Sequence, residues 1–396
     1  MIKSHFNFFV PTKIIFGPGR LSELAKEELP GKKALIVIGG KSVKKYGYLD
    51  RVIGYLKENN VDSVVFDKIE PNPILEHVME GAELAKKNNC DFVLGLGGGS
   101  SIDSAKSIAI MANNPGNYWD YVCGGTALCK PVPNDPLPIV AVTTTAGTGT
   151  EADPWTVVTN PETKEKIGYG YSKTFPTLSI VDPELMVTVP KNLTAFQGMD
   201  AFFHSVEGYL ATAAQPSSDL FALESVGLIA KYLPLAVNDG ENIEARTAVA
   251  WANTAAGIVE STSSCISHHS MEHALSALHP ELPHGAGLTL LSTSYFSFMA
   301  ERVLSARFIT LARIMGEDVS QYKSSEKPMA FIAALKKLIE NVGLSELRLS
   351  DYGIFNEEKE ILTDNAIETM GGLFGVDPYK LEREDVIEIF DKALDK

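Results

Sequence analysis

The first half of the chain alternates short, β-branched apolar runs with longer amphipathic segments. Strands covered on both faces read as continuous apolar runs, so we predict buried strands at 34–38, 63–66, 91–96 and 139–143. Helical patterns lie between them, for example at 49–59 and 75–87. Strand, helix and strand at this spacing predict a parallel, doubly wound α/β sheet, whose ligands bind at the carboxyl ends of the strands.

The pattern changes in the second half of the chain. From about Leu193 onward, Ala- and Leu-rich segments with a 3.6-residue period replace the strands, as at 219–232 and 245–260. At 396 residues the chain is too long for one ordinary hydrophobic core. We therefore predict an α/β dinucleotide-binding domain over 1–187 and an all-helical metal- and substrate-binding domain over 188–396.

Charge and composition limit the classes of partner that the protein can bind. The 50 acidic and 35 basic side chains give a net charge of -15 without a basic cluster, which disfavours a nucleic-acid partner. No stretch approaches the ~18 apolar residues of a membrane span, and we identify no signal peptide. The cysteine spacings favour free thiols in a reducing cytoplasm at all four positions: Cys90, Cys123, Cys129 and Cys265. We therefore expect a cytoplasmic protein without a membrane partner.

Two polar turns follow predicted strands. The first, GGGSSIDSAK from Gly97, combines glycines that allow close backbone approach with a helix N-terminus that attracts anions, which is typical of a pyrophosphate site. A tight turn capped by Ser100 is the structural alternative. The second, TTTAGTGTE over 143–151, offers hydroxyl donors to a polar ligand across the same crevice, although it could equally be a simple loop.

A third strand end bears on the choice of dinucleotide. Folds selective for NAD usually place a carboxylate here to bind the ribose 2′-hydroxyl. This chain has small residues and cations instead: Gly39, Gly40, Lys41 and Ser42, then Lys44 and Lys45. Room and positive charge favour a 2′-phosphate and hence NADP(H), unless the lysines are only solvated helix charges.

Histidines and a carboxylate recur at helical spacing in the second half. Asp200 and His204 are four residues apart, as are His269 and His273, and His284 follows in the sequence PHG. Residues at i and i+4 share one helix face, and carboxylate plus imidazole ligands suit Fe²⁺ or Zn²⁺. Such a site can keep an open position at which chemistry occurs.

The charge around these segments bears on the substrate. No Lys or Arg occurs between Lys191 and Lys231, or between Arg246 and Arg302. Phosphorylated or strongly acidic substrates usually recruit such cations. The two gaps therefore favour a small neutral alcohol or aldehyde.

The motifs together resemble the iron-containing (group III) alcohol dehydrogenases. The resemblance spans nearly the whole chain and rests on FFVPTKIIFGPGRLSEL, EPNP at 70–73, GGGSSIDSAK, TTTAGTGTE, GMDAFFHSVEGYLA and the HxxxH followed by PHG. It implies a dehydroquinate synthase-like fold with an α/β domain and an all-α domain. The stretch GGKSVKKYG looks like the NADP(H)-using butanol dehydrogenase and aldehyde reductase branch.

Residue roles follow from the resemblance. It implies that the metal is bound by Asp200, His204, His269 and His284, and that His273 sits beside the substrate. It also implies a dinucleotide site lined by Asn72, Gly98, Gly99, Ser100, Asp103, Thr144, Thr145, Thr148 and Lys166, to which we add Gly39, Gly40 and Ser42.

The sequence departs from the family pattern at one place. The interval from His273 to His284 is one residue longer than in the nearest branch, and it contains His279, which could replace His284 as a ligand. A shift of one residue would likewise offer His268 in place of His269. We prefer His269 because it has a histidine four residues on.

We therefore expect a metal-dependent alcohol dehydrogenase or aldehyde reductase. A hydride would pass reversibly between NADP(H), or NAD(H), and a primary alcohol or aldehyde such as butanol or butanal, with Fe²⁺ or Zn²⁺ as Lewis acid. The proton would leave through the cofactor ribose or through His273. A lyase resembling 3-dehydroquinate synthase, with an acidic phosphorylated substrate, is one alternative, and a non-catalytic metal or nucleotide sensor is another. We also expect a homo-oligomer, a dimer or larger.

Overall fold

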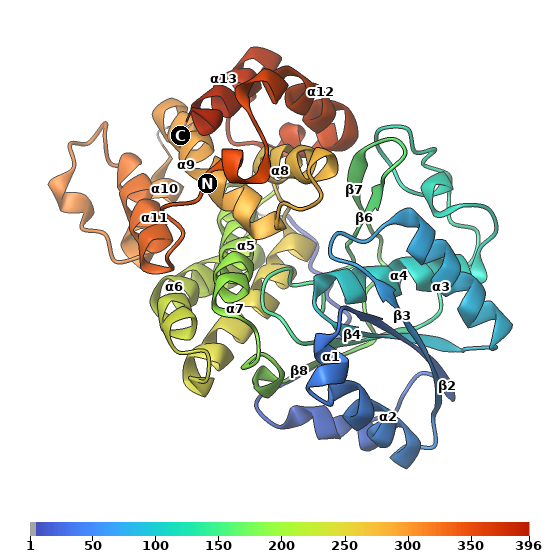
Figure 1. The fold of residues 1–396 in the computed structure, drawn as a ribbon. Helices are drawn as coiled ribbons and strands as arrows, with labels where there is room; N and C mark the ends of the chain where they lie inside the picture. Colours follow the sequence, from blue (N-terminus) through green and yellow to red (C-terminus); the bar gives the residue numbers. More distant parts are fainter. Residues whose placement is uncertain (1–4, 304, 396) are drawn as a thin grey trace. The chain divides into compact units, whose positions relative to one another are not determined.

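A computed structural model describes residues 5–303 and 305–395 (Figure 1). The chain forms two compact units. One comprises residues 10–188, and the other comprises residues 189–395 together with residues 5–9. The α/β and all-helical parts predicted from the hydrophobic pattern are both present, so the fold class is confirmed.

A six-stranded parallel sheet forms the centre of the first unit. Its strands, in spatial order, are β1 (Lys13–Phe16), β8 (Leu178–Val181), β5 (Ile139–Thr143), β4 (Phe92–Gly97), β2 (Lys33–Gly39) and β3 (Asp62–Ile69). The four predicted strands correspond to β2, β3, β4 and β5. Strands β1 and β8, of four residues each, had not been predicted.

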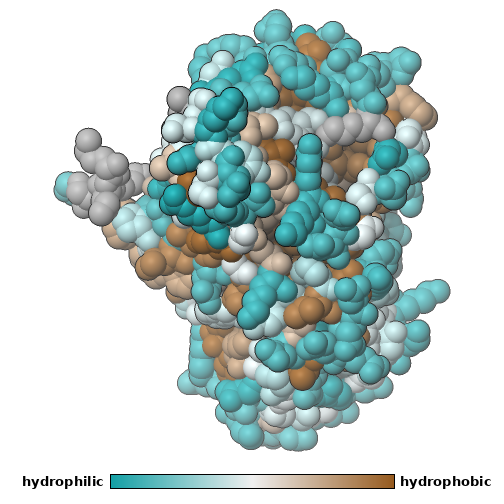
Figure 2. Space-filling view, turned by 90° about the vertical axis from the view of Figure 1, so that its left-hand side faces the viewer, coloured by the Kyte–Doolittle hydropathy of each residue, from teal (hydrophilic) through white to brown (hydrophobic). Residues whose placement is uncertain are grey.

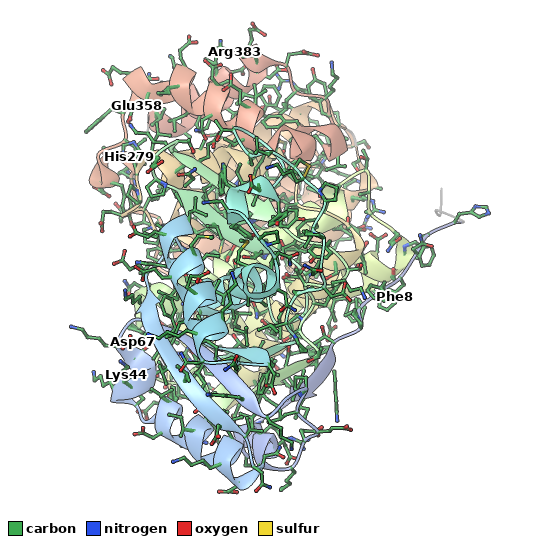
Figure 3. The ribbon with its side chains drawn as sticks, turned by 90° about the vertical axis from the view of Figure 1, so that its right-hand side faces the viewer. Phe8, Lys44, Asp67, His279, Glu358 and Arg383 are labelled. Atoms are coloured by element: carbon green, nitrogen blue, oxygen red, sulfur yellow. A yellow bond between two sulfur atoms is a disulfide. The ribbon has the colours of Figure 1, made fainter. Side chains whose placement is uncertain are left out.

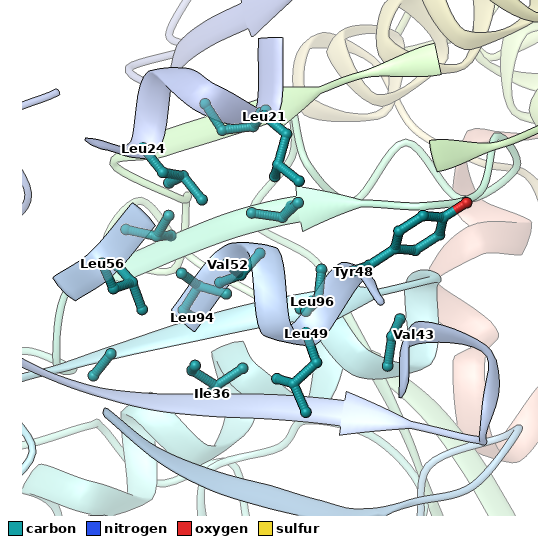
Figure 4. Packing of buried hydrophobic residues seen from close by; sticks show 14 of the residues in the cluster. Leu21, Leu24, Ile36, Val43, Tyr48, Leu49, Val52, Leu56, Leu94 and Leu96 are labelled. Atoms are coloured by element: carbon teal, nitrogen blue, oxygen red, sulfur yellow. The ribbon is translucent and has the colours of Figure 1, made fainter. Parts of the chain in front are cut away.

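Helices cover both faces of this sheet. They are α1 (Ser42–Lys45), α2 (Tyr48–Glu58), α3 (Leu75–Lys87) and α4 (Gly99–Asn113). Leu94 and Leu96 of β4 belong to a buried cluster with Val52 of α2 (Figure 4). Gly95 points to the opposite face, where Ile102 of α4 lies so close that a Cβ atom on Gly95 would be 2.9 Å from its Cα atom. The absence of a side chain at Gly95 therefore seats α4 directly on the strand.

A short antiparallel hairpin stands apart from the main sheet. It consists of β6 (Thr156–Asn160) and β7 (Glu165–Tyr169), and the backbone N–H of Thr159 donates to Pro73 O at 2.7 Å.

A disulfide joins Cys123 to Cys129 in the segment between α4 and β5, whereas Cys90 and Cys265 are free. The expectation of four free thiols was therefore wrong, because the short loop between Cys123 and Cys129 brings their Cα atoms to 4.4 Å. The cysteines therefore no longer support a reducing compartment.

Within residues 189–303 and 305–395, the regular elements of the second unit are all helices. Its helices are α5 (Lys191–Leu210), α6 (Pro216–Asn238), α7 (Ile243–Thr262), α8 (Ser267–Leu278), α9 (His284–Arg302), α10 (Ala306–Ile314), α11 (Met329–Asn341), α12 (Lys359–Met370) and α13 (Arg383–Leu394). Gly198 and Gly208 let α5 approach its neighbours, since a Cβ atom on either would lie 2.2 Å from Leu233 of α6 or Val259 of α7.

Helix α6 is long and apolar enough to cross a membrane by length and composition. The sequence analysis expected no apolar segment long enough to span a membrane, and by length and composition α6 does not meet that expectation. A core helix passes the same test, and α6 packs against α5 and α7.

Candidate functional site

Helix α5 carries the first two predicted metal ligands. Asp200 and His204 lie one turn apart, and both are buried, at 4% and 5% exposure. Helix α9 begins at His284, and Gly285 allows this first turn to rest on α5, because a Cβ atom there would lie 2.0 Å from Phe196 O. The glycine after His284 thus lets the third histidine of the site reach Asp200.

Three imidazoles converge on one carboxylate oxygen. The Nε2 atoms of His204, His284 and His269 lie 3.4, 3.5 and 3.7 Å from Asp200 Oδ1. Around a tetrahedral ion with bonds near 2.1 Å, neighbouring ligand atoms are about 3.4 Å apart. Asp200 Oδ1 and His269 Nε2 are buried and have no hydrogen-bond partner among the described residues. Buried polar atoms are rarely left unpaired, so this donor set fits a divalent metal ion.

Two buried glutamates orient the histidines, and the sequence analysis missed both. His269 donates through Nδ1 to Glu207 Oε1 at 2.7 Å, and His284 donates through Nδ1 to Glu272. Each bond fixes the tautomer that leaves Nε2 free to bind an ion. Glu207 lies three residues after His204 on α5, in a segment without Lys or Arg. A carboxylate buried in such a segment must accept its hydrogen bonds from side chains other than Lys or Arg, such as histidine. This was the signal in the sequence that could have identified Glu207.

The electrostatics set the protonation of the site. Burial raises the pKa of Asp200, but the imidazoles of His204 and His284 lower it more, to about 2. Burial lowers the pKa of His204 to about 4, so this ring is neutral at pH 7. Burial also lowers the pKa of His269, but its interactions with Cys265 and with the Glu207 carboxylate raise it well above the usual value.

Neither His268 nor His279 belongs to this group of candidate ligands. Both ring nitrogens of His268 are engaged, Nδ1 with Glu207 Oε1 at 2.6 Å and Nε2 with Leu288 O at 3.0 Å. His279 contacts Glu358 Oε1 through Nε2 at 2.9 Å (Figure 3). Of the alternatives that the sequence left open, the structure therefore groups His269 and His284 with Asp200.

His273 lies beside the cluster. Its ring centre is 5.4 Å from that of His284 and 6.5 Å from that of His269. Its Nδ1 donates to Met370 Sδ at 2.8 Å, which leaves the lone pair on Nε2. This tautomer can accept a proton at Nε2.

A second pair of groups, also missed from sequence, borders the cluster. Glu260 Oε1 lies 3.3 Å from His204 Nε2, and Cys265 Sγ donates to the same oxygen at 3.1 Å. These residues come from the end of α7 and the turn before α8.

The two predicted nucleotide turns lie side by side in the first unit. The Thr144 N–H donates to Gly97 O at 2.9 Å. A Cβ atom on Gly98 would lie 3.0 Å from Thr145, and one on Gly99 would lie 2.4 Å from Thr148. Ser100 is the second residue of α4, so these groups surround the N-terminus of that helix.

The end of β2 reaches the same helix. A Cβ atom on Gly39 would lie 3.3 Å from Ser101 Oγ, and Gly40 takes the left-handed conformation, with φ 62°. Ser42 starts α1, and Lys44 forms an ion pair with Asp67 that lowers the pKa of this carboxyl (Figure 3). One cation assigned to a 2′-phosphate is therefore already paired.

Three other predicted cofactor residues lie around the hairpin. Asn72 precedes Pro73, whose carbonyl accepts from Thr159, and Thr159 pairs with Lys166 across β6 and β7. Asp103 is buried, and its two oxygens accept from the Thr150 hydroxyl at 2.7 Å and the Val157 N–H at 2.9 Å. Both carboxylate oxygens of Asp103 are therefore already hydrogen-bonded to residues of the first unit.

Known proteins match the whole chain. Residues 11–183 match the model of the iron-containing alcohol dehydrogenases, and 194–394 match that family's C-terminal model. The chain is 35% identical to an NAD-dependent methanol dehydrogenase of Bacillus methanolicus, covering 98% of this chain and 100% of the relative. It is 32% identical to NADH-dependent butanol dehydrogenase A of Clostridium acetobutylicum, covering 98% and 99%. An archaeal alcohol dehydrogenase from a Red Sea brine pool superposes with a TM-score of 0.93 at 34% identity, covering 100% of both chains.

Proposed function

This chain belongs to the iron-containing alcohol dehydrogenase family, and from that premise we propose that it transfers a hydride reversibly between NADP(H) and a small neutral primary alcohol or aldehyde, such as butanol or butanal. The observation that carries the proposal is the approach of three imidazole Nε2 atoms to within 3.4–3.7 Å of Asp200 Oδ1. The family match gives no support to the lyase or sensor alternatives.

Asp200, His204, His269 and His284 are the residues that would hold the metal. Fe²⁺, which we favour over Zn²⁺ from the family, would supply Lewis-acid polarisation of the substrate oxygen. Glu207 and Glu272 keep the rings of His269 and His284 turned towards Asp200. His273 accepts or returns the substrate proton at Nε2, while its Nδ1–H remains bonded to Met370.

The first unit supplies the groups for the dinucleotide, which carries the hydride. The N-terminus of α4, with Gly98, Gly99 and Ser100, suits the pyrophosphate. Lys41 and Lys45, which follow Gly40 in the sequence, supply charge for a 2′-phosphate, and this supports NADP(H). The two relatives described above carry NAD or NADH in their names, so the cofactor has to be decided by direct comparison.

The substrate proposal rests on local charge. The Lys- and Arg-free segments contain α8, most of α5 and nearly all of α9, the helices that carry the four candidate ligands. A neutral alcohol needs no cationic partner, whereas a carboxylate or phosphate would lack one on these helices.

We further propose that the chain forms a homo-oligomer. Phe6, Phe8 and Phe9 are 46%, 51% and 54% exposed, and the face in Figure 2 carries apolar patches among hydrophilic side chains. Clustered exposed aromatics are typical of protein interfaces. Light scattering of the wild type and of a variant with all three replaced by serine would test this: a monomeric wild type contradicts it.

The function is tested by assay of anaerobically purified protein. Butanal reduction is followed at the nicotinamide absorbance band with NADPH and with NADH, and the metal content is measured on the same sample. We expect turnover that a chelator abolishes and Fe²⁺ restores, with a higher kcat/KM for NADPH. Absence of turnover with alcohols, aldehydes and ketones, despite bound metal and dinucleotide, would contradict the proposal.

A further inference from the structure

Lys106 is a buried charge that the proposed mechanism does not use. It lies on α4, and its side chain is fully buried. Its Nζ donates to Thr150 Oγ1 at 2.6 Å, to Trp155 O at 2.6 Å, and to Asp153 at 2.9 Å (O) and 3.0 Å (Oδ1). One ammonium group therefore binds three residues of the segment between β5 and β6.

Asp103 holds the same segment from one helical turn earlier on α4. Its Oδ1 accepts the Thr150 hydroxyl, which in turn accepts from Lys106, and its Oδ2 accepts the Val157 N–H. Asp153 Oδ1 also accepts the Trp155 N–H at 2.7 Å. The segment 150–157 is thus bonded to α4 near both of its ends.

Stability alone gives little reason for a lysine here. Removing an ammonium group and a carboxylate from water costs several kcal/mol each, and well-packed apolar side chains often serve a core equally well. What an apolar side chain cannot supply is direction. The three ammonium hydrogens fix the places of particular oxygens, and therefore the path of the segment that carries them.

The fixed segment leads directly into the polar turn. Thr148 is two residues before Thr150, and its side chain packs against Gly99. A Cβ atom on Gly99 would lie 2.4 Å from Thr148 Cγ2. The Thr150 N–H lies 3.4 Å from Thr148 Oγ1. A shift of Thr150 would therefore move Thr148 relative to the N-terminus of α4.

We propose that Lys106, with Asp103, Thr150 and Asp153, is a positioning network for the dinucleotide site. It holds the polar turn against the glycines of α4, so that the hydroxyls of Thr145 and Thr148 and the amides of the helix N-terminus face the nucleotide together. This inference rests on the proposed dinucleotide site, and it assigns the lysine of GGGSSIDSAK a role in binding without contact with the ligand.

The test compares dinucleotide affinity among variants of the full-length protein. Dissociation constants for NADPH and NADH are measured by nucleotide fluorescence in wild type, Lys106→Met, Thr150→Val and Thr150→Ser. Thr150→Val keeps the shape but removes the hydroxyl, and Thr150→Ser keeps the hydroxyl. We expect affinity to fall about tenfold or more in Lys106→Met and about threefold or more in Thr150→Val, since each loses hydrogen bonds to a charged group. Thr150→Ser should stay within about twofold of wild type, because its bonds remain.

Ile108→Ala is the control for simple loss of stability. Ile108 is fully buried on the same helix, but its side chain faces Gly81 of α3, where a Cβ atom would be 2.4 Å from Ile108 Cδ1. We expect this variant to lower the unfolding midpoint and leave dinucleotide affinity unchanged. Metal content, set by residues of the other unit, is expected to stay at the wild-type level in every variant.

The outcomes separate this inference from the function on which it rests. A wild type that binds neither dinucleotide overturns both. A wild type that binds, with Thr150→Val equal to Thr150→Ser, overturns the positioning network alone, and so does an equal loss in Ile108→Ala. If Lys106→Met does not fold, the Thr150 pair still decides the question.

Discussion

Replacing Glu207 with glutamine is expected to weaken metal binding while the helical fold is kept. Glu207 is fully buried and accepts hydrogen bonds from His268 Nδ1 at 2.6 Å, His269 Nδ1 at 2.7 Å and the Ile266 N–H at 3.0 Å. Burial raises its pKa, but the two imidazoles lower it further, so the carboxylate is charged at neutral pH.

The size of the effect follows from the geometry of the amide. Glutamine offers one acceptor oxygen and one NH₂ group, whereas Oε1 of Glu207 serves both imidazoles and Oε2 serves Ile266. With either orientation of the amide, an N–H group faces another donor, and at least one bond is lost. Loss of such an orienting partner typically costs about 10- to 100-fold in metal affinity, or ~1.4–2.7 kcal/mol.

The assay is anaerobic competition between the protein and a chelator of known Fe²⁺ affinity. The matched control is Glu358→Gln, which removes the carboxylate partner of His279, a pair of the same chemistry outside the cluster. Circular dichroism of the metal-free proteins checks that both variants fold. Equal metal affinity in wild type and Glu207→Gln, or an equal loss in Glu358→Gln, would refute the orienting role.

Three other perturbations separate the roles of individual residues. His273→Gln is expected to lower turnover by about 10²- to 10⁴-fold, the usual contribution of a proton-transfer group, with metal content unchanged; loss of the metal would make His273 a ligand instead. Lys41→Ala is expected to raise the KM for NADPH about tenfold by loss of a charged hydrogen bond, and a matching rise for NADH would argue against contact with a 2′-phosphate. Burial raises the pKa of Asp103 from 3.8 to about 6, so the folded protein holds this proton where the unfolded chain has lost it. The free energy of unfolding is therefore expected to fall as the pH rises from 4 to 6, by at most about 3 kcal/mol. The variant Asp103→Asn should remove that fall. Urea titrations that give the same pH dependence in both proteins would contradict this.

Four strands of the sheet were predictable, including the edge strand β3, but β1 and β8 were not. Strands β2, β4 and β5 are buried on both faces, and continuous apolar runs show this directly. The edge strand β1 contains only KIIF, and its place follows from parallel pairing with β8, some 165 residues along the chain. Local sequence does not encode such a pairing.

The metal ligands were accessible from sequence because a helix repeats every 3.6 residues. The spacing of Asp200 and His204 places both on one face of α5. It does not say which of His268 and His269 faces Asp200, because that depends on how α8 packs. The pairing of Glu207 with His269 joins residues 62 positions apart, and only the folded unit brings them together.

Titration of metal-free protein with Fe²⁺ during NADPH-dependent butanal reduction tests the central claim most directly. If Asp200, His204, His269 and His284 form the one metal centre of turnover, activity rises linearly and stops rising at about one equivalent per chain, as expected for a single four-ligand site. The same titration of Asp200→Asn should give no such rise. Turnover by metal-free wild type, or an undiminished rise in Asp200→Asn, would contradict the account.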